Sequence, residues 1–213
     1  MALLITPTLL NSYNWLRKCP QSWKDRAYND IMSTLKREPF VTNIAIEKGN
    51  SFEKAVYANA NSDLDNLQAS DFFINVCKRV KGYDFQKSIK LDFEVDDEKY
   101  CCFGRIDCYS PKEIIDIKTT GNFKGDSQYL TGWQHLFYTA IPNIPNFTYL
   151  VIEWESENNY AIKSVNEVKY IMEDKEKVFN TITDGIRTFI DYLKHDDDMS
   201  NAYYTIYNKY DKR

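Results

Sequence analysis

Two adjacent runs of alternating apolar and polar residues constrain the fold of this chain more than any other feature. In residues 86–95 (QKSIKLDFEV) every second residue from position 89 is apolar, which is typical of a half-buried strand. Residues 96–99 predict a turn, 100–109 a returning strand, and 110–113 a second turn. Residues 114–118 predict a third strand, so the pattern indicates a three-stranded meander.

Helical periodicity is predicted on both sides of this meander. A helix is expected to begin at Thr6-Pro7-Thr8, where proline suits the first turn, and to end near Cys19-Pro20. Apolar residues at helical spacing predict three more helices, over about 45–59, 68–81 and 128–141.

The C-terminal third predicts further strands and one long helix. The run FTYLVIEWE predicts a fourth strand, and residues 159–163 allow a fifth. Ser164 and Glu167 form a capping-box pattern, which predicts a long amphipathic helix over roughly 165–195. The charged, tyrosine-rich tail that follows has no predicted structure.

The order of these elements predicts the fold class. We expect an α/β protein with a mixed sheet of 4–5 strands flanked by helices (αβββαβ), with N-terminal helices and the long C-terminal helix. The 213 residues fit one domain, 1–213, with a core over roughly 40–165.

Composition limits the class of partner. The formal net charge of −4 argues against a surface that is basic throughout, but it leaves room for a local basic groove. The N-terminal stretch has no basic leader and is broken by Pro7, so we expect a cytoplasmic protein without a membrane partner. Five cysteines, an odd number with two adjacent, predict reduced thiols.

Charged residues inside the predicted strands are the candidate chemistry. Asp116 and Lys118 are two apart on one strand and therefore share a face, and Asp107 lies on the neighbouring strand. A solvated ion pair is the common alternative for an aspartate and a lysine so spaced. Carboxylate oxygens suit Mg²⁺ or Mn²⁺, and a lysine can orient water and stabilise a phosphate. Two carboxylates and a lysine in this arrangement suit phosphodiester hydrolysis.

Four segments of the chain also resemble one family in the right order. Gly104-Arg105-Ile106-Asp107 and Asp116-Ile117-Lys118-Thr119 resemble the G-x-x-D and D-x-K elements of the PD-(D/E)xK nucleases. Gln134 to Tyr138 matches the Q-x-x-x-Y motif of their RecB-like exonuclease branch, and Gly49 to Glu53 is similar to its G-x-x-x-(H/E) helix. The N-terminal helix with its trailing Cys19-Pro20 also resembles that branch. The resemblance covers roughly residues 5–155.

The resemblance implies a restriction-endonuclease-like core and assigns roles to residues. A Mg²⁺ (or Mn²⁺) ion would be held by Glu53, Asp107, Asp116 and the backbone carbonyl of Ile117. The implied catalytic residues are Asp107, Asp116, Lys118, Glu53, Gln134 and Tyr138, and the implied nucleic-acid contacts are Gln134, Tyr138, Arg105 and Thr119. Glu53 on a solvated helix face and Tyr138 in the core remain as alternatives.

The cysteines and histidines are not assigned to a metal site. Family members with an iron-sulfur cluster carry three cysteines near the C-terminus, and residues 109–213 contain none. We therefore expect no iron-sulfur cluster, and we expect the cysteines to pack as small apolar residues. His135 and His195 are expected on the surface.

The leading functional hypothesis is a metal-dependent DNA exonuclease that acts on ends in recombination, repair or phage DNA processing. The sequence has no G-x-x-x-x-G-K-[ST] motif, so unwinding or end-loading would come from a homo-oligomer or from a recombination or helicase partner. A catalytically inactive nuclease-fold module that binds DNA or serves assembly is one alternative. A structure- or sequence-specific endonuclease is another.

Overall fold

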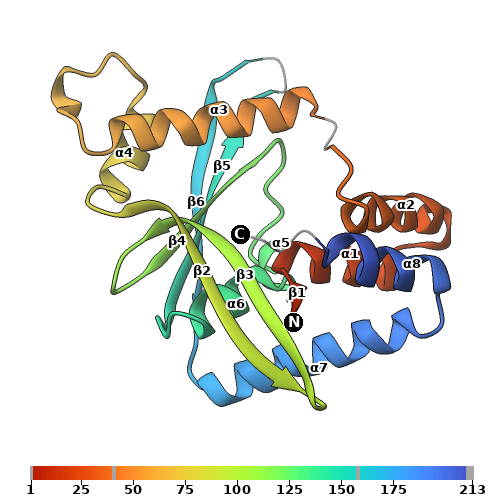
Figure 1. Ribbon diagram of the computed structural model, residues 1–213. Helices are drawn as coiled ribbons and strands as arrows, with labels where there is room; N and C mark the ends of the chain where they lie inside the picture. Colours follow the sequence, from red (N-terminus) through yellow and green to blue (C-terminus); the bar gives the residue numbers. More distant parts are fainter. Residues whose placement is uncertain (1, 40–41, 157–158, 210–213) are drawn as a thin grey trace.

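A six-stranded mixed sheet lies at the centre of this computed structural model, which describes residues 2–39, 42–156 and 159–209 (Figure 1). The strands are β1 (Leu3–Ile5), β2 (Asp84–Val95), β3 (Glu98–Tyr109), β4 (Ile114–Thr120), β5 (Asn146–Trp154) and β6 (Ile162–Ile171). Their order is β1-β3-β4-β5-β6, and β2 also pairs with β3. The expected α/β class with a mixed sheet flanked by helices is confirmed, and the sheet has more strands than predicted.

The long hairpin of β2 and β3 is the alternating pair that the sequence predicts. The two strands pair in antiparallel fashion from Asp84 opposite Tyr109 to Val95 opposite Glu98. Asp96 and Asp97, both at positive φ (51° and 64°), make the turn. Two residues of that conformation fit the twist of a tight hairpin, which explains why β3 begins two residues before the predicted strand.

The sheet divides between β3 and β4. These strands pair only at Cys108 with Ile115 and at Tyr109 with Ile114, and beyond that point β4 continues in parallel beside β5. At the far end of β3, the same edge pairs in parallel with β1. We call the opening between β3 and β4 the fork. Backbone groups that face the fork need other partners, because buried amides and carbonyls are rarely left unpaired.

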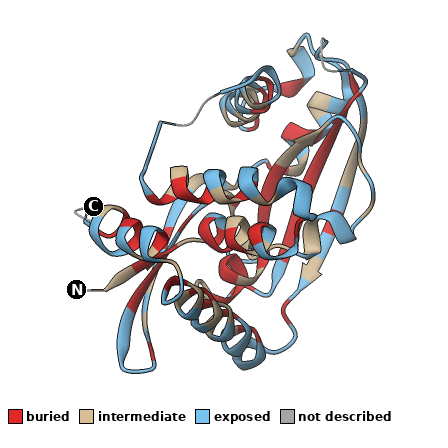
Figure 2. Ribbon diagram, turned by 90° about the vertical axis from the view of Figure 1, so that its right-hand side faces the viewer, coloured by how far each residue is buried: buried red, intermediate tan, exposed pale blue. Residues whose placement is uncertain are grey.

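Helices cover both faces of the sheet, and each face has its own apolar cluster. On one face, α3 (Ile44–Asn59) and α4 (Asp71–Arg79) pack through Phe52 and Val76 onto Ile117 and Leu150. On the other face lie α1 (Pro7–Lys18), α2 (Lys24–Leu35), α6 (Gln134–Ala140) and α7 (Lys175–Leu193). Figure 2 shows buried residues along the sheet and along the inner sides of these helices. Two short 3₁₀ turns, η1 (Gln21–Trp23) and η2 (Leu64–Asn66), connect helices.

The first helix forms as predicted. The Thr6 hydroxyl accepts a hydrogen bond from the amide of Leu9 (3.1 Å), and Pro7 occupies the first turn. The helix ends at Lys18, with Cys19 as its cap. All five cysteines are free and buried, which confirms their packing role. No helix in the described ranges is long and apolar enough to cross a membrane.

The prediction for residues 164–174 is wrong. Residues up to 171 belong to β6, and α7 begins only after Asp174, whose carboxylate accepts from the Lys177 amide (3.1 Å). The Ser164 hydroxyl donates to Glu153 on the neighbouring strand (2.9 Å) and caps no helix. The capping-box spacing is therefore a coincidence within a strand, where Ser164 and Val168 also fit an alternating pattern.

The predicted helix over 128–141 is two helices. The chain forms α5 (Ser127–Leu130), breaks at residues 131–133, and resumes as α6. The carbonyl oxygen of the Asn11 side chain accepts a hydrogen bond from the Trp133 amide (2.9 Å). This bond attaches α1 to the break and provides a partner for an amide at the start of α6.

The tyrosine-rich tail packs on the N-terminal strand. It forms α8 (Asp197–Asn201) and a π-helical turn, η3 (Ala202–Tyr207). The Tyr203 hydroxyl donates to the carbonyl of Leu4 (3.1 Å), and the side chain of Asn208 accepts from the Leu4 amide. These bonds anchor β1, which the sequence did not predict.

Candidate active site

The fork brings Asp107 and β4 together. The Asp107 carboxylate accepts a hydrogen bond from the backbone amide of Ile117 (3.0 Å). It therefore replaces the backbone partner that β4 lacks once β3 has diverged. The carbonyl of a strand residue points to the same side as its own amide, so the Ile117 carbonyl also faces the fork.

Asp116 and Lys118 form a close pair next to this position. The Asp116 side chain is 1% exposed, and its Oδ2 lies 2.6 Å from Nζ of Lys118. Its Oδ1 accepts a hydrogen bond from the side-chain amide of Gln134 on α6. The Lys118 side chain is 36% exposed. The pair is therefore not the solvated edge pair that the alternative interpretation would predict.

The carboxylates influence one another. Burial raises the pKa of Asp116 well above its ordinary value, and the charge of Asp107 adds to this effect while Lys118 opposes it. Burial and the charge of Asp107 raise the pKa of Glu53 to about 7. Burial lowers the pKa of Lys118, but the charges of Asp116 and Asp107 outweigh burial and raise it. Negative charge is thus concentrated where a cation would be stabilised.

Glu53 reaches this cluster from α3, on the other side of β4. The helix approaches β4 closely at Gly49, where an added Cβ would lie 2.8 Å from the Thr119 hydroxyl oxygen. Glycine at this position therefore sets the distance between α3 and β4. Glu53, one turn later in the helix, is partly buried, so the alternative of a fully solvated helix face does not describe it.

Gln86 is a site residue that the sequence analysis missed. Its side-chain amide donates to Asp107 (3.1 Å) and to the hydroxyl of Tyr57 on α3 (2.8 Å). Its φ of 57° is unusual for a residue with a side chain, and residue 86 has no partner in the otherwise continuous register of β2 and β3. The pairs before and after it keep one register, so this is a local distortion of the ladder opposite Asp107, with no residue inserted. No residue type in the alternating pattern signals it.

Tyr138 is buried, and its hydroxyl donates to the backbone carbonyl of Arg105 (2.8 Å). Its ring lies against Gly104, where an added Cβ would be 2.5 Å from Cε1. Tyr138 thus packs across the fork onto β3. This position agrees with the alternative interpretation of Tyr138 as a core residue. The side chain of Arg105 is exposed, and Thr119 is partly buried at the end of β4.

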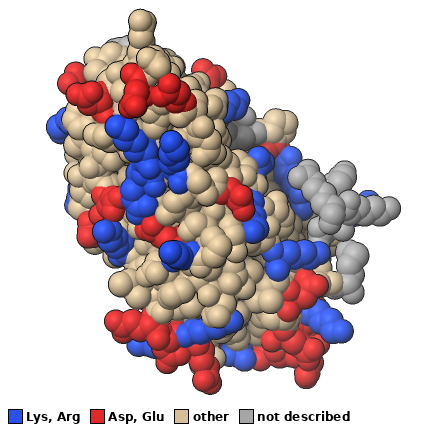
Figure 3. Space-filling view, turned by 90° about the vertical axis from the view of Figure 1, so that its left-hand side faces the viewer, with Lys and Arg blue, Asp and Glu red and all other residues tan. Residues whose placement is uncertain are grey.

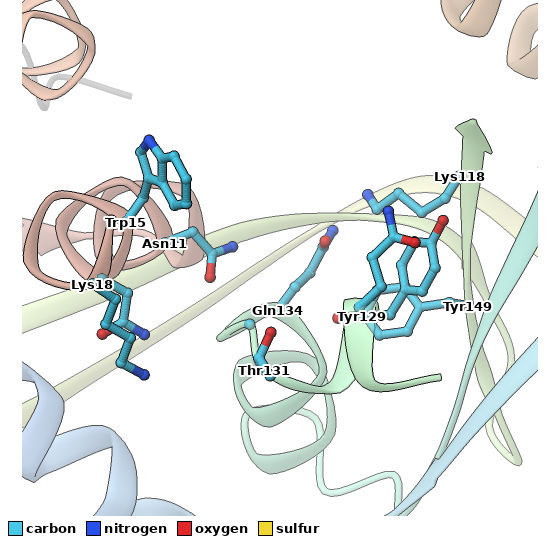
Figure 4. A pocket seen from close by; sticks show the side chains of 11 residues that line it. Asn11, Trp15, Lys18, Lys118, Tyr129, Thr131, Gln134 and Tyr149 are labelled. Carbon is cyan, nitrogen blue, oxygen red and sulfur yellow. The ribbon is translucent and has the colours of Figure 1, made fainter. Parts of the chain in front are cut away.

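Two pockets meet at Lys118. The larger, about 490 Å³, lies between α1 and the segment from α5 to α6, and Lys118 and Gln134 are among its lining residues. Figure 4 shows side chains of α1 on one side of it and Lys118, Tyr129 and Tyr149 on the other. The second pocket, about 330 Å³, is lined by residues of α3 and β4 that include Glu53, Ile117 and Thr119. Lys118 therefore borders both pockets.

The expected surface position of His135 is wrong. His135 is 3% exposed. Its Nδ1 lies 3.2 Å from the Tyr149 hydroxyl, and its ring is 4.5 Å from that of Tyr170. Burial lowers the pKa of His135 to about 4. It directly follows Gln134 in α6, and consecutive residues of a helix point about 100° apart, so its ring does not share the direction of the Gln134 side chain. His195 is exposed, as expected.

The donor set is chemically suited to a hard divalent cation. The charge of Asp107 raises the pKa of both Glu53 and Asp116, so the three carboxylates lie near one another, and Asp and Glu oxygens are preferred ligands of Mg²⁺. Among the described residues, no three His, Cys, Asp or Glu side chains already converge as a ligand group. The oxygens of Asp107 and Asp116 contact protein groups instead, but each oxygen has a second lone pair.

Charge on the surface is mixed. On the face shown in Figure 3, Lys and Arg side chains form a central group, with Asp and Glu gathered toward both ends. The net charge of −4 therefore does not describe every part of the surface. Local basic regions exist alongside acidic ones.

Comparison with known proteins finds likeness at the level of the fold alone. No family model and no curated protein matches the chain. Among solved structures, SSO0001 is similar at 13% identity over 88% of this chain and 77% of that chain, with a TM-score of 0.51. A phage-related exonuclease from Haemophilus somnus 129PT (12% identity, 98% and 94% covered, TM-score 0.48) and Rai1 from Scheffersomyces stipitis (13%, 92% and 62%, 0.36) also match. At such identity, the likeness to SSO0001 shows a common fold alone.

Proposed function

We propose that this chain is a metal-dependent deoxyribonuclease that hydrolyses phosphodiester bonds at DNA ends. One observation carries the proposal: the fork places Asp107 beside the pair of Asp116 and Lys118, with Glu53 on the adjacent helix. These are the residue types that phosphodiester hydrolysis needs at one point. Asp107 also provides a partner for the Ile117 amide, but the burial and mutual repulsion of these carboxylates cost stability that a bound cation would offset.

Mg²⁺ or Mn²⁺ would be held by Asp107 and Asp116, with Glu53 and the Ile117 carbonyl as further oxygen donors. When bound, such an ion lowers the pKa of a water molecule and offsets charge on the phosphate. Lys118 provides N–H donors that orient the water or the phosphate oxygen. Gln134 keeps the Asp116 carboxylate in place through its hydrogen bond.

The remaining residues contribute to binding and positioning. Thr119 lines the pocket that also contains Glu53, where its hydroxyl would contact a phosphate oxygen. The exposed side chain of Arg105 would pair with the DNA backbone. Tyr138 acts through the β3 backbone, because its hydroxyl is occupied by the Arg105 carbonyl.

The substrate is DNA, in recombination, repair or phage DNA processing, with a homo-oligomer or a helicase as a candidate partner. The complete set of two acids and a lysine supports an enzyme over a catalytically silent nuclease-fold module. An endonuclease would use the same residues, so the experiment must separate cleavage at ends from internal cleavage.

The test incubates the purified protein with end-labelled linear DNA, nicked DNA and closed circular DNA, in single- and double-stranded forms, with Mg²⁺, Mn²⁺ or EDTA. We expect mononucleotide release from linear DNA with either metal and none with EDTA. Asp116→Asn and Lys118→Gln should each lower the rate by at least about 100-fold.

Lys163→Gln is the matched control. Lys163 also pairs with a carboxylate of a neighbouring strand, Glu153 (2.9 Å), but it lies outside the site. Its substitution should leave cleavage unchanged. Retained DNA binding without cleavage under any metal would favour the inactive module, and linearisation of closed circles would favour the endonuclease. Activity that survives both site substitutions would contradict the assignment of the site.

A further inference from the structure

We propose that the larger pocket, between α1 and Lys118, binds one nucleotide of a single-stranded DNA end, with its base stacked on Trp15 and its phosphate on Lys18. We call it the α1 pocket. This inference rests on the proposed function, because it names the form of DNA that the site accepts. It assigns a role to the outer face of α1, which the catalytic cluster does not use.

The sequence of α1 separates an inner and an outer face. Leu9, Tyr13 and Leu16 are buried in the core. Asn11, Trp15 and Lys18 follow one another at helical spacing and line the pocket. The helix therefore packs through one side and presents an aromatic ring, an amide and an ammonium group on the other (Figure 4).

Trp15 is the main feature of this outer face. Its side chain is 47% exposed, although burial of an indole ring stabilises most folds by a large amount. Nucleobases stack on exposed aromatic rings, and this contact tolerates any base because every base has a π-face. Tyr129, which also lines the pocket, offers a second ring on the far side. The pocket thus has aromatic surfaces on both sides for a planar group.

The charge of the pocket favours a phosphate. Of the described residues that line it, Lys18 and Lys118 are basic and none is acidic. This is unusual in a chain whose net charge is −4. Phosphate contacts of lysine supply much of the affinity for nucleic acid, so the two lysines would hold the backbone at both ends of the pocket.

The pocket is held in a fixed position relative to the catalytic cluster. The Asn11 side chain accepts from the Trp133 amide (2.9 Å), and Gln134, the next residue, bonds to Asp116. One short connection therefore links the α1 pocket with the buried carboxylate. A strand bound there would have its next phosphate at Lys118, where the second pocket begins.

The size of the pocket suits a single nucleotide. A volume of about 490 Å³ is in the range of pockets that enclose small ligands. It accommodates one nucleotide, whereas a base pair would have to be opened first. Opening a terminal base pair costs unpairing and unstacking energy. An end that is already single-stranded does not need this step.

The test measures binding of fluorescein-labelled oligo-dT to the full chain by anisotropy in EDTA, so that no cleavage occurs. Trp15→Ala should weaken binding by about 5- to 100-fold, as expected for loss of a base-stacking ring. Trp15→Phe should restore most of the affinity. The control is Trp23→Ala, because Trp23 is equally exposed (45%) but lies on η1, outside the pocket.

Salt dependence tests Lys18. Lys18→Gln should reduce the slope of log affinity against log salt by about 0.7, as expected for one phosphate contact with a single strand. Lys177→Gln, at an exposed lysine of α7, should leave the slope unchanged. Circular dichroism of each variant checks that the fold is retained.

Cleavage is measured in parallel, so that the two proposals can fail separately. If Trp15→Ala binds like the wild type, or if Trp23→Ala weakens binding equally, the inference is wrong even where the wild type cleaves DNA. If the wild type binds through Trp15 but cleaves nothing, the inference holds and the proposed function fails. A wild-type protein that binds no oligo-dT overturns the inference whatever the cleavage assay shows.

Discussion

The hydroxyl of Tyr138 donates a hydrogen bond to the backbone carbonyl of Arg105, 2.8 Å away, at the place where β3 has left β4. Asp107 makes the complementary contact two residues later, by accepting from the amide of Ile117. Side chains from α6 and β3 thus replace backbone pairing on both edges of the fork. The site geometry depends on these two bonds.

Tyr138→Phe should destabilise the protein by about 1–2 kcal/mol, because the substitution leaves the Arg105 carbonyl without its buried partner. Urea unfolding measures this change. In the cleavage assay, kcat should fall while KM for DNA stays near the wild-type value. Tyr160→Phe, at a tyrosine that is 66% exposed, is the control. A Tyr138→Phe protein of unchanged stability that binds DNA more weakly would instead indicate a direct contact with DNA.

Gly104→Ala should also destabilise the protein, by roughly 1–3 kcal/mol, because the new Cβ would lie 2.5 Å from Cε1 of Tyr138. The double variant Gly104→Ala/Tyr138→Leu should lose less stability than the sum of the losses in the two single variants, because the clash is with the tyrosine ring. Denaturant unfolding of the four proteins gives the coupling. Gly121→Ala, which meets no atom within 4 Å, should be neutral. If the stability losses of the two single substitutions simply add in the double variant, the Tyr138 ring is not what limits the space at Gly104.

His135 should make stability depend on pH. Its pKa is lowered to about 4 in the folded chain, whereas an unfolded chain titrates near its ordinary value of about 6.5. Between these values the unfolded state binds more protons, so the free energy of unfolding rises with pH. The contribution is complete above about pH 6.5 and is lost as pH falls toward 4, by up to roughly 3 kcal/mol.

Unfolding curves from pH 4 to pH 7 measure this contribution. Other groups titrate in the same range, so the informative quantity is the difference between the wild type and His135→Gln. The pH dependence of His135→Gln should be shallower than that of the wild type. Parallel curves for wild type and His135→Gln would contradict the assigned burial of a neutral imidazole.

Gln86→Gly should separate activity from stability. The variant loses the amide that bonds to Asp107, so kcat should fall at least several-fold. Glycine accepts the φ of 57° more readily than glutamine does, which should keep the stability within about 1 kcal/mol of the wild type. Asp97→Gly, at the positive φ of the hairpin turn, tests the backbone effect alone and should retain full activity. Equal kcat in Gln86→Gly and the wild type would rule out a positioning role.

Sequence reasoning was most successful where local pattern and tertiary burial agree. The alternation around Ile89 and Leu91 predicts the β2 and β3 hairpin because one side of that hairpin is buried and the other is not. The position of Asp107 beside Asp116 follows from the short turn between β3 and β4. Both inferences need only the two-residue period of a strand.

Sequence reasoning was less successful where tertiary contacts override local signals. Ser164 and Glu167 satisfy a capping-box pattern, yet β5 provides a buried strand to pair with, and pairing prevails. The strand β1 has only three residues, too few for any periodicity. His135 follows a motif residue, and only the position of Tyr149 and Tyr170 shows that it is buried.

The contact between Leu4 and the chain near Asn208 has a consequence for biosynthesis. The strand that precedes α1 pairs with β3, almost a hundred residues later, and is anchored by side chains another hundred residues beyond. Such distant contacts cost loop-closure entropy and form late. During translation, the helix that carries Trp15 would therefore remain undocked until residues near 208 have been made. A growing chain would then complete the strands that carry Asp107 and Asp116 before it positions α1, so the proposed nucleotide pocket would form after them.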